Sequence, residues 1–461
     1  MTVVWQDNDR SVSVEEDGCR REKKSGFGSK YQQMRSGKKF SLAWSAFAIV
    51  TLAAAGVARA ESGLNANQLV ELAVEVNPQI RSMRAQWNAA QHQILQNYAP
   101  ADPTFTYTNV DASHGILNNA ATHAHSLTEN FQFPGKAELQ AEQAKTTANI
   151  ARFAYEAAIR DLRAAVETAY YQVLLDGGLI DINGQNIENL HQVLKVTEIA
   201  YSTGQAAQTD FITAEVNLAQ AQLQQRQYLV NKSNDETTLN QLLYREPDNP
   251  IALDRTMRLS RLDLRLQTAV EMAFHARQEI LAAALTERNQ NTALELARFE
   301  YVPDYNVGLE YDQFLQNGAQ PLPNVTHGVT VSIGFNLPVF FWIHQKEDVT
   351  SAQYALDAAR ENLKLIRSQT AANVTQLYRS ARFAYDSAQL YKESLIPLAN
   401  QDFQVGLTAY QSRKIDFLTL SAALQASYSA RVSYLQSANQ YFAGQVALEQ
   451  AIGAPLPNEA H

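Results

Sequence analysis

The hydrophobic pattern starts with a helical period and then changes to a period of two. Within residues 66–97, apolar side chains stand three or four positions apart, as on the buried face of an amphipathic helix. Asp102-Pro103 ends this pattern, and residues 104–108 (Thr-Phe-Thr-Tyr-Thr) then alternate as the two faces of a strand do. We therefore expect one helix over 66–97 and a strand after it.

A longer strand pattern occupies residues 325–337, which alternate over 13 positions. One face is apolar and the other carries small or polar residues, which suits a barrel strand between lipid and water. A soluble hairpin packed against helices is the alternative explanation. On the membrane interpretation, the lipid face carries Val329, Val331, Ile333 and Phe335, and the lumen face carries Thr330, Ser332 and Gly334.

Long helical segments follow each strand region. Residues 137–202 keep a spacing of three to four between apolar positions, which predicts a helix ~100 Å long. A turn at 202–205 and a second helix over 208–245 complete a hairpin. Such a helix needs neighbours along its whole length, as in a coiled-coil array. The second half of the chain predicts a matching pair over 345–407 and 414–452, the longer helix kinked at Pro397.

These patterns belong to an internal repeat. Matching segments recur in the same order at offsets near 200, which predicts a first repeat over 61–246, a linker over 247–263 and a second repeat over 264–461. The pairs are Tyr98-Ala99-Pro100 with Tyr301-Val302-Pro303, Phe131-Gln132-Phe133-Pro134 with Phe335-Asn336-Leu337-Pro338, and Asp210-Phe211-Ile212-Thr213 with Asp416-Phe417-Leu418-Thr419.

The N-terminal region has the composition of a targeting segment. Basic residues at 35–39 precede a mostly apolar stretch over 40–57, and Ala58-Arg59-Ala60 fits a signal-peptidase site. We expect residues 1–60 to be a signal peptide, with translation starting at Met1 or at Met34. An uncleaved N-terminal membrane anchor is the alternative.

Charge and cysteine content narrow the choice of partners. The 461 residues include 38 Lys or Arg and 47 Asp or Glu, of which ten and six precede residue 61, so the expected mature chain has a net charge of −13. This excess of acid argues against nucleic acid as a partner. Cys19, the single cysteine, precedes the expected cleavage site. After that site, the sequence has no apolar run long enough for a membrane helix.

The sequence carries no motif of a known catalytic site. It lacks a phosphate-binding loop, a nucleophile elbow and an HExxH motif, so we expect the protein not to be an enzyme and to need no cofactor. His123 and His125 stand two apart in a predicted strand and could bind a metal ion. Two histidines with a structural role near the strand end are the alternative, which we favour because His123 matches His327 in the repeat.

Three local motifs accompany this order of elements. They are the strand-to-helix exit Gln132-Phe133-Pro134-Gly135-Lys136 with Asn336-Leu337-Pro338 opposite it, the hairpin tip Tyr201-x-x-Gly204 followed by Asp210-Phe211-x-x-Ala214, and the second tip Arg413-Lys414-Ile415-Asp416-Phe417-Leu418. With helix, strand pair and long hairpin repeated twice behind a signal peptide, the chain resembles the TolC-type outer membrane factors. The Phe-Pro-Gly-Lys exit is most similar to the heavy-metal branch of the CzcC and CusC kind.

The resemblance implies a mainly α fold with a small β part, in which two tandem repeats provide long helical hairpins and four transmembrane strands. A homotrimer would form an α/β barrel in the outer membrane that extends into the periplasm. It would act as a passive conduit with a periplasmic adaptor (a membrane fusion protein) and an inner-membrane pump of the resistance-nodulation-division type. Heavy-metal cations are one candidate substrate. The alternatives are a multidrug or type I secretion channel, or a soluble periplasmic coiled-coil adaptor.

The resemblance also assigns roles to individual residues. It places Asp416 at the periplasmic aperture and pairs Asp210 with Arg413 or Lys414. Each aspartate could instead cap a helix; we favour the aperture for Asp416 and the cap for Asp210. The remaining site residues are Tyr201 and Gly204 in the first tip turn, Tyr410 in the place of Gly204 at the second, and Pro134, Gly135, Lys136 and Pro338 at the strand-to-helix exits.

Overall fold

The computed structural model describes residues 63–109, 123–313 and 327–457. The chain divides into two units, Met1–Glu61 and Ser62–His461, and the described residues belong to the second unit. The expected signal peptide, its cleavage site, Cys19 and both candidate start residues lie outside the described residues.

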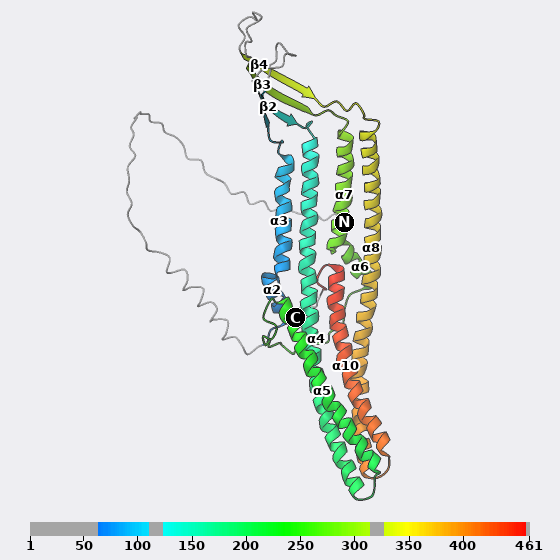
Figure 1. Ribbon diagram of the computed structural model, residues 1–461. Coiled ribbons are helices and arrows are strands. Elements are labelled where there is room, and N and C mark those ends of the chain that lie inside the picture. Colours follow the sequence, from blue (N-terminus) through cyan, green and yellow to red (C-terminus); the bar gives the residue numbers. More distant parts are fainter. Residues whose placement is uncertain (1–62, 110–122, 314–326, 458–461) are drawn as a thin grey trace, which may run out of the picture. The chain divides into compact units, whose positions relative to one another are not determined.

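Elements follow the same order in both halves of the second unit (Figure 1). The first half contains α2 (Ala66–Val76), α3 (Pro78–Tyr98), β1 (Thr104–Asn109), β2 (His123–Phe131), α4 (Lys136–Ser202) and α5 (Gln208–Leu242). The second half contains α6 (Leu266–Ala276), α7 (Gln278–Phe299), β3 (Tyr305–Gln313), β4 (His327–Phe335), α8 (His344–Leu390), the π-helical turn η2 (Tyr391–Leu395), α9 (Ile396–Gln411) and α10 (Phe417–Ile452).

The prediction of one continuous helix over 66–97 is wrong, because the helix breaks at Asn77. This residue is extended, with φ −68° and ψ 123°, since the ring of the following Pro78 disfavours helical geometry there. Asn77 then caps α3 through its Oδ1, which accepts a hydrogen bond from the Gln79 N–H at 2.8 Å. Arg277 makes the matching break without a proline, and its guanidinium donates to the carbonyl oxygen of Ala451 at 3.1 Å.

The long helices agree with their predicted bounds. α4 continues unbroken for 67 residues, including Gly177, Gly178 and Gly184. Gly178 serves close packing, because a Cβ there would lie 2.6 Å from Cδ1 of Leu435 on α10. α4 packs against α3, α5, α7 and α10 along its length, which supplies the neighbours that so long a helix requires.

Near Pro397, where the sequence predicts a kink, the helix contains a π-helical turn. Proline has no N–H to donate to the preceding turn of helix. Just before it, the N–H of Ile396 bonds to the carbonyl oxygen of Tyr391, five residues back, and η2 absorbs the irregularity between α8 and α9.

The four strands form one antiparallel sheet in the order β1-β2-β3-β4. The central β2–β3 pair joins the two halves of the chain, with Leu127 opposite Leu309. The described part of the last strand covers nine residues, fewer than the 13 expected. Residues 325 and 326 lie outside the described residues, and the strand stops before Pro338, which cannot donate to a ladder.

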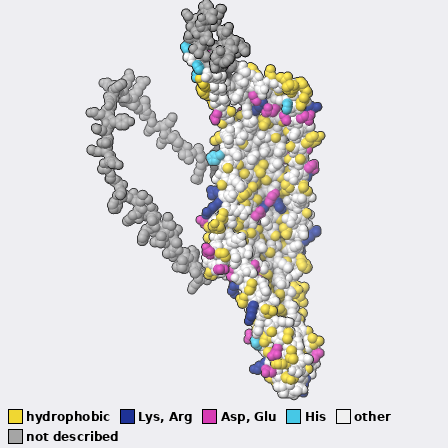
Figure 2. Space-filling model, viewed as in Figure 1, with side chains coloured by type: hydrophobic (Ala, Val, Ile, Leu, Met, Phe, Trp, Pro, Cys, Tyr) yellow, Lys and Arg dark blue, Asp and Glu magenta, His cyan; other side chains and the backbone are white. Residues whose placement is uncertain are grey.

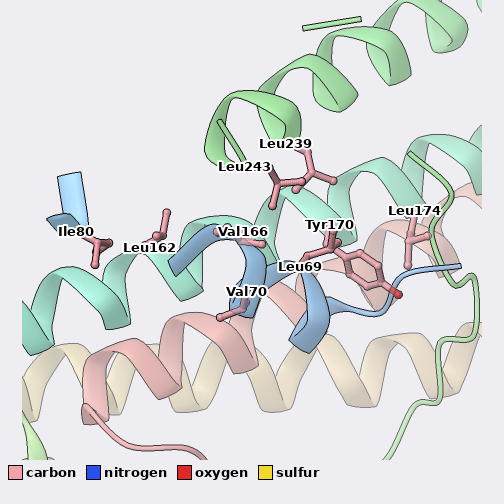
Figure 3. Packing of buried hydrophobic residues seen from close by; sticks show 10 residues of the cluster. Leu69, Val70, Ile80, Leu162, Val166, Tyr170, Leu174, Leu239 and Leu243 are labelled. Carbon is pink, nitrogen blue, oxygen red and sulfur yellow. The ribbon is translucent and has the colours of Figure 1, made fainter. Parts of the chain in front are cut away.

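Buried side chains form several clusters along the helices. One cluster joins α2, α3, α4 and α5 near the middle of the helical part (Figure 3). A second joins the two hairpin tips, so that α4 and α5 pack against α9 and α10. No described helix combines the length and apolar composition that a membrane span requires. Figure 3 labels members of the first cluster, Leu69, Val70, Ile80, Leu162, Val166, Tyr170, Leu174, Leu239 and Leu243.

Candidate functional site: the sheet, its exits and the hairpin tips

The two faces of the sheet differ in chemistry. Because opposed residues share a face, the ladder sets Phe105 beside Leu127, Leu309 and Val331 across all four strands. The apolar residues of β4 on this face are between 65% and 70% exposed. The opposite face carries Thr106, Ser126, Glu310 and Thr330 in the same register. The alternation predicted for β4 therefore extends over the whole sheet.

The strand histidines bond to tyrosines of the neighbouring strand. Nδ1 of His123 lies 2.9 Å from the Tyr107 hydroxyl, and Nδ1 of His327 lies 3.0 Å from the Tyr311 hydroxyl. The rings of each pair are also stacked. The described residues contain no group of three or more His, Cys, Asp or Glu side chains that could hold a metal ion. The recurrence of the pair in both halves supports a structural role for these histidines.

The first strand-to-helix exit is built around a buried lysine. Lys136 begins α4, and its side chain is only 3% exposed. Its ammonium group lies 3.0 Å from Oδ1 of Asp304 and 3.3 Å from Oε2 of Glu300, which follow α7. Asp304 also accepts a hydrogen bond from the Phe133 N–H at 2.8 Å. The Phe-Pro-Gly-Lys motif therefore connects the exit of the first half to the start of β3.

The glycine of this motif is required by its backbone. Gly135 has φ 102°, a conformation that side chains of L residues rarely adopt, and a Cβ there would lie 3.3 Å from the Phe299 ring. The preceding Pro134 cannot continue the β2 ladder. In the second half, Pro338 is followed by a hydrogen-bonded turn, and α8 begins only at His344.

The two hairpin tips have the same turn geometry, which corrects one prediction. The Gln205 N–H bonds to the Ala200 carbonyl oxygen at 2.7 Å, and the Lys414 N–H bonds to the Ala409 carbonyl oxygen at 2.8 Å. In this alignment Arg413, with φ 60°, is the counterpart of Gly204, with φ 69°. Tyr410 was expected there and is instead the counterpart of Tyr201.

The tip tyrosines pack on the phenylalanines of the Asp-Phe motifs. Tyr201 stacks on Phe211 at a centroid distance of 6.1 Å, and Tyr410 meets Phe417 edge-on at 6.3 Å. Burial raises the pKa of Tyr410, the nearby carboxylate of Asp210 raises it further, and the Thr197 hydroxyl acts in the opposite direction. The structure therefore brings Asp210 close to Tyr410 of the other hairpin.

The two aspartates differ in whether they cap a helix. Asp416 is the N-cap of α10, and its Oδ1 accepts a hydrogen bond from the Thr419 N–H at 2.8 Å. Hydrogen bonds from the Thr419 hydroxyl and N–H hold the pKa of Asp416 below its usual value. Asp210 is the third residue of α5, within its first turn; the N-cap is Ala207, and Asp210 makes no capping bond. The cap assigned to Asp210 is therefore wrong.

The expected pairing of Asp210 across the tips is also not formed. Within the described ranges, neither Arg413 nor Lys414 makes an ion pair with Asp210. The side chain of Asp416 is exposed at its tip, as are those of Arg413 and Lys414. An exposed acid beside two exposed basic residues gives the second tip mixed charge.

Sequence reasoning missed one ion-pair network between the halves. Arg160 of α4 donates to both carboxylate oxygens of Glu279 on α7, at 2.6 and 2.8 Å, and to Oε1 of Gln278. Burial opposes ionisation of Glu279, but the hydrogen bonds from Arg160 and from the backbone, together with the positive charges of Arg160 and Arg277, outweigh it and lower its pKa to about 2. Arg160 and Glu279 are 119 positions apart in the sequence, so no local pattern indicates this contact.

Comparisons with known proteins agree with this architecture. The family described as outer membrane efflux protein matches residues 69–243 and 269–454. The chain is 22% identical to outer membrane protein TolC of Escherichia coli over 88% of its length and 85% of the relative. It is 20% identical to the cobalt-zinc-cadmium resistance protein CzcC of Cupriavidus metallidurans, covering 70% of this chain and 75% of that one.

A solved structure shows the same fold. The outer-membrane channel OprN superposes with a TM-score of 0.72 at 17% identity, covering 85% of this chain and 90% of that one. Because the matched family is one of outer membrane efflux proteins, the alternative of a soluble periplasmic adaptor is set aside, and the relatives of the chain are channels rather than enzymes. The chain belongs to the outer membrane efflux protein family: it is the outer-membrane channel component of an efflux system, and this channel extends into the periplasm.

Proposed function

We propose that three copies of this chain form one passive conduit from the periplasm to the exterior. In the described residues, β1 and β4 each pair with a strand on one side only. Stable proteins usually pair or cover the exposed edges of their sheets, so β4 of one copy would pair with β1 of the next. Each copy would then contribute four strands to a closed barrel, with its helices forming a periplasmic tunnel.

The two-faced sheet is the observation that carries this proposal. An apolar face that is well exposed in one copy suits contact with lipid, and the face of small polar residues suits a wet lumen. Sedimentation of the mature protein in detergent tests the assembly. The expected mass is that of three chains, and a particle with the mass of one chain would contradict the proposal.

The strand edges allow a more specific test. Cys19 is the chain's single cysteine and precedes the expected cleavage site, so the engineered cysteines would be the only thiols in the expected mature protein. Thr106→Cys on β1 combined with Thr330→Cys or Ser332→Cys on β4 should give disulfide-linked multimers under mild oxidation. Each single variant is the control and should give fewer linked species. Equal cross-linking in single and double variants would argue against the edge pairing.

The division into two repeats has a mechanical role in this proposal. Residues 61–246 and 264–461 each supply a strand pair and a hairpin, and the linker 247–263 lies along the helices. Tyr170 of α4 donates to the Asp254 carbonyl oxygen at 2.6 Å, which helps to hold the linker in place. Leu64 also pairs with Leu253 in a parallel bridge. The linker would therefore keep the two hairpins in register.

The hairpin tips are the proposed contact for a periplasmic adaptor, which would join this channel to an inner-membrane pump of the resistance-nodulation-division type. The tips lie at the end of the helices opposite the sheet (Figure 1). A photo-cross-linking residue at Gln205 should capture a periplasmic adaptor co-expressed with the channel. The same residue at Gln93 on α3 is the control and should not capture it.

Heavy-metal cations are the substrate that we propose. One relative is named for cobalt, zinc and cadmium resistance, and an ionised Asp416 at the second tip of each copy would favour cations near the aperture. Deletion of the gene should lower the concentrations of these metals that stop growth. Unchanged metal tolerance combined with sensitivity to organic drugs would favour the multidrug alternative, and loss of a secreted protein would favour type I secretion.

A further inference from the structure

A short apolar turn follows the last strand and is exposed along its whole length. Residues 339–343 read Val-Phe-Phe-Trp-Ile, and their side chains are between 49% and 60% exposed. Leu337 just before them is also exposed. Figure 2 shows hydrophobic side chains gathered where α8 begins in Figure 1, with charged side chains below them. So large an exposed apolar patch indicates an interaction surface.

The first half of the chain has no such turn. There the helix begins two residues after Pro134, and Lys136 in its first position is buried in the ion pair with Asp304. In the second half, α8 begins six residues after Pro338, and apolar residues, three of them aromatic, occupy the positions between. The apolar turn is therefore an addition to one of the two exits, and the ion pair that shapes the other exit does not explain it.

The turn is folded so that much of its backbone is hydrogen-bonded internally. The Val339 N–H bonds to the Leu337 carbonyl oxygen at 2.8 Å, and the N–H groups of Ile343 and His344 bond to the Phe340 carbonyl oxygen at 2.9 and 3.1 Å. Backbone groups that are paired in this way cost little to move out of water. The side chains also support one another, because the Phe341 and Trp342 rings meet edge-on at a centroid distance of 5.3 Å.

We propose that residues 339–343 insert into the periplasmic leaflet of the outer membrane and anchor each protomer there. The proposal rests on the proposed function, in which the apolar face of the sheet contacts lipid. The turn continues that face directly, since Phe335 is exposed at the end of β4 and Leu337 follows it. Trp and Phe are suited to the boundary between acyl chains and headgroups, and exposed Lys346 in the next helical turn can reach lipid phosphates.

Tryptophan fluorescence can test this insertion without adding a label. Of the four tryptophans, Trp5 and Trp44 precede the expected cleavage site, so Trp87→Phe leaves Trp342 as the mature protein's single reporter. The protein is reconstituted into phosphatidylcholine vesicles whose acyl chains carry bromine near either the ester end or the methyl end. Trp342 should be quenched at least twofold, and more strongly by bromine near the ester end, because an interfacial anchor enters only ~5–10 Å.

Two matched variants decide the result. Trp342→Phe leaves Trp87, which stacks on Tyr155 of α4, and this reporter should be quenched little. Equal quenching of Trp342 and Trp87 would overturn the anchor. The same result is expected if a protein, rather than lipid, covers the turn. Val331→Trp, in a background lacking both native tryptophans, reports on the sheet. If this reporter is quenched and Trp342 is not, the anchor fails while the membrane sheet stands; if neither is quenched, the proposed function fails.

Discussion

The ammonium group of Lys136, the first residue of α4, lies 3.0 Å from the carboxylate of Asp304, just before β3. This contact connects the end of one strand pair to the beginning of the other. Lys136 is buried, whereas Asp304 and Glu300 remain about one-third and two-fifths exposed. The pair is therefore intermediate between a buried salt bridge, whose disruption costs several kcal/mol, and a surface pair of little value.

Replacement of the buried lysine should destabilise the junction. Lys136→Met keeps most of the side-chain volume but leaves both carboxylates without their cation, so we expect a loss of ~2 kcal/mol. Thermal unfolding of the protein in detergent measures the change. Lys145→Met is the matched control, because Lys145 is 63% exposed and lies 3.9 Å from its partner Glu142. A loss at Lys136 no larger than at Lys145 would show that the contact does not stabilise the junction.

This contact also shows the limit of prediction from sequence. The long helix over 137–202 and the strand alternation follow from patterns within a few residues, and the structure confirms them. At Pro397, where the sequence predicts a kink, the structure shows a π-helical turn just before the proline. The partner of Lys136 depends on how β2 pairs with β3, which no local pattern determines. The break at Asn77 was open to prediction, because Pro78 stands in the middle of the expected helix.

The tips were predicted less well for a related reason. The Asp-Phe motif recurs at an offset of 206, but α5 begins two residues before its motif whereas α10 begins within its own. Asp210 and Asp416 therefore look equivalent in sequence and occupy different positions in their helices. Only the hydrogen bonds of the turns reveal the shift, by aligning Gly204 with Arg413.

A buried carboxylate should make stability depend on pH. Burial raises the pKa of Glu167 to about 7 from a model-peptide value of 4.5, with nearby Glu449 raising it further and Arg163 opposing the shift. The folded protein therefore holds a proton between pH 4.5 and 7 that the unfolded chain releases, and stability falls as the pH rises through this window. Glu167→Gln removes the ionisable group, so it should stabilise the protein above pH 7 and change little below pH 4.5.

The expected gain at alkaline pH is ~1–2 kcal/mol once solvent screening is allowed for. Melting temperatures across this range give the measurement. Glu167→Asp is the control, because it keeps the charge and should keep a decline in stability with rising pH. A parallel decline in wild type and Glu167→Gln would exclude this carboxyl group as the source.

The equivalence of Gly204 and Arg413 predicts opposite effects of substitution. Both residues have positive φ, which is favourable for glycine and unfavourable for arginine. A Cβ at Gly204 would meet no atom within 4 Å, so Gly204→Ala tests the backbone alone and should cost ~1 kcal/mol. Arg413→Gly should stabilise its turn by ~0.5 kcal/mol, because the lost strain is partly offset by the greater freedom of the unfolded chain.

Hydrogen exchange of the tip amides measures these two effects, since a weaker turn opens more often. Gly204→Ala should accelerate exchange around residue 205, and Arg413→Gly should slow it around residue 414. Substitution effects of the same sign at both tips would contradict the shared turn geometry.

The two faces of β4 should differ in their tolerance of charge. Val331→Arg would place a guanidinium on the proposed lipid face, at an expected cost of ~2–4 kcal/mol near the middle of the bilayer. Thr330→Arg, one residue away, would face the proposed lumen and should cost little. Assembly of heat-modifiable multimers in outer-membrane fractions provides the measurement. Equal losses from both substitutions would contradict the assignment of the faces.

The last prediction separates two roles of Asp416, which caps α10 and is proposed to supply charge at the aperture. Asparagine accepts the same hydrogen bond from the Thr419 N–H as aspartate does, so Asp416→Asn removes the charge and retains the cap. Asp416→Ala removes both and should lower the stability of the hairpin by ~1 kcal/mol. Comparing the two substitutions therefore distinguishes a loss of charge from a loss of structure.

Conductance in planar bilayers measures the contribution of the charge. Three copies of Asp416 would form a ring that attracts cations, so Asp416→Asn should reduce the preference for cations and weaken block by multivalent cations. Asp210 lies near Tyr410 of the other hairpin, so we expect its charge to act between the hairpins and not at the aperture. Asp210→Asn should therefore change selectivity less. If Asp416→Asn kept the cation preference and the block of the wild type, Asp416 would be a helix cap without a role in the aperture.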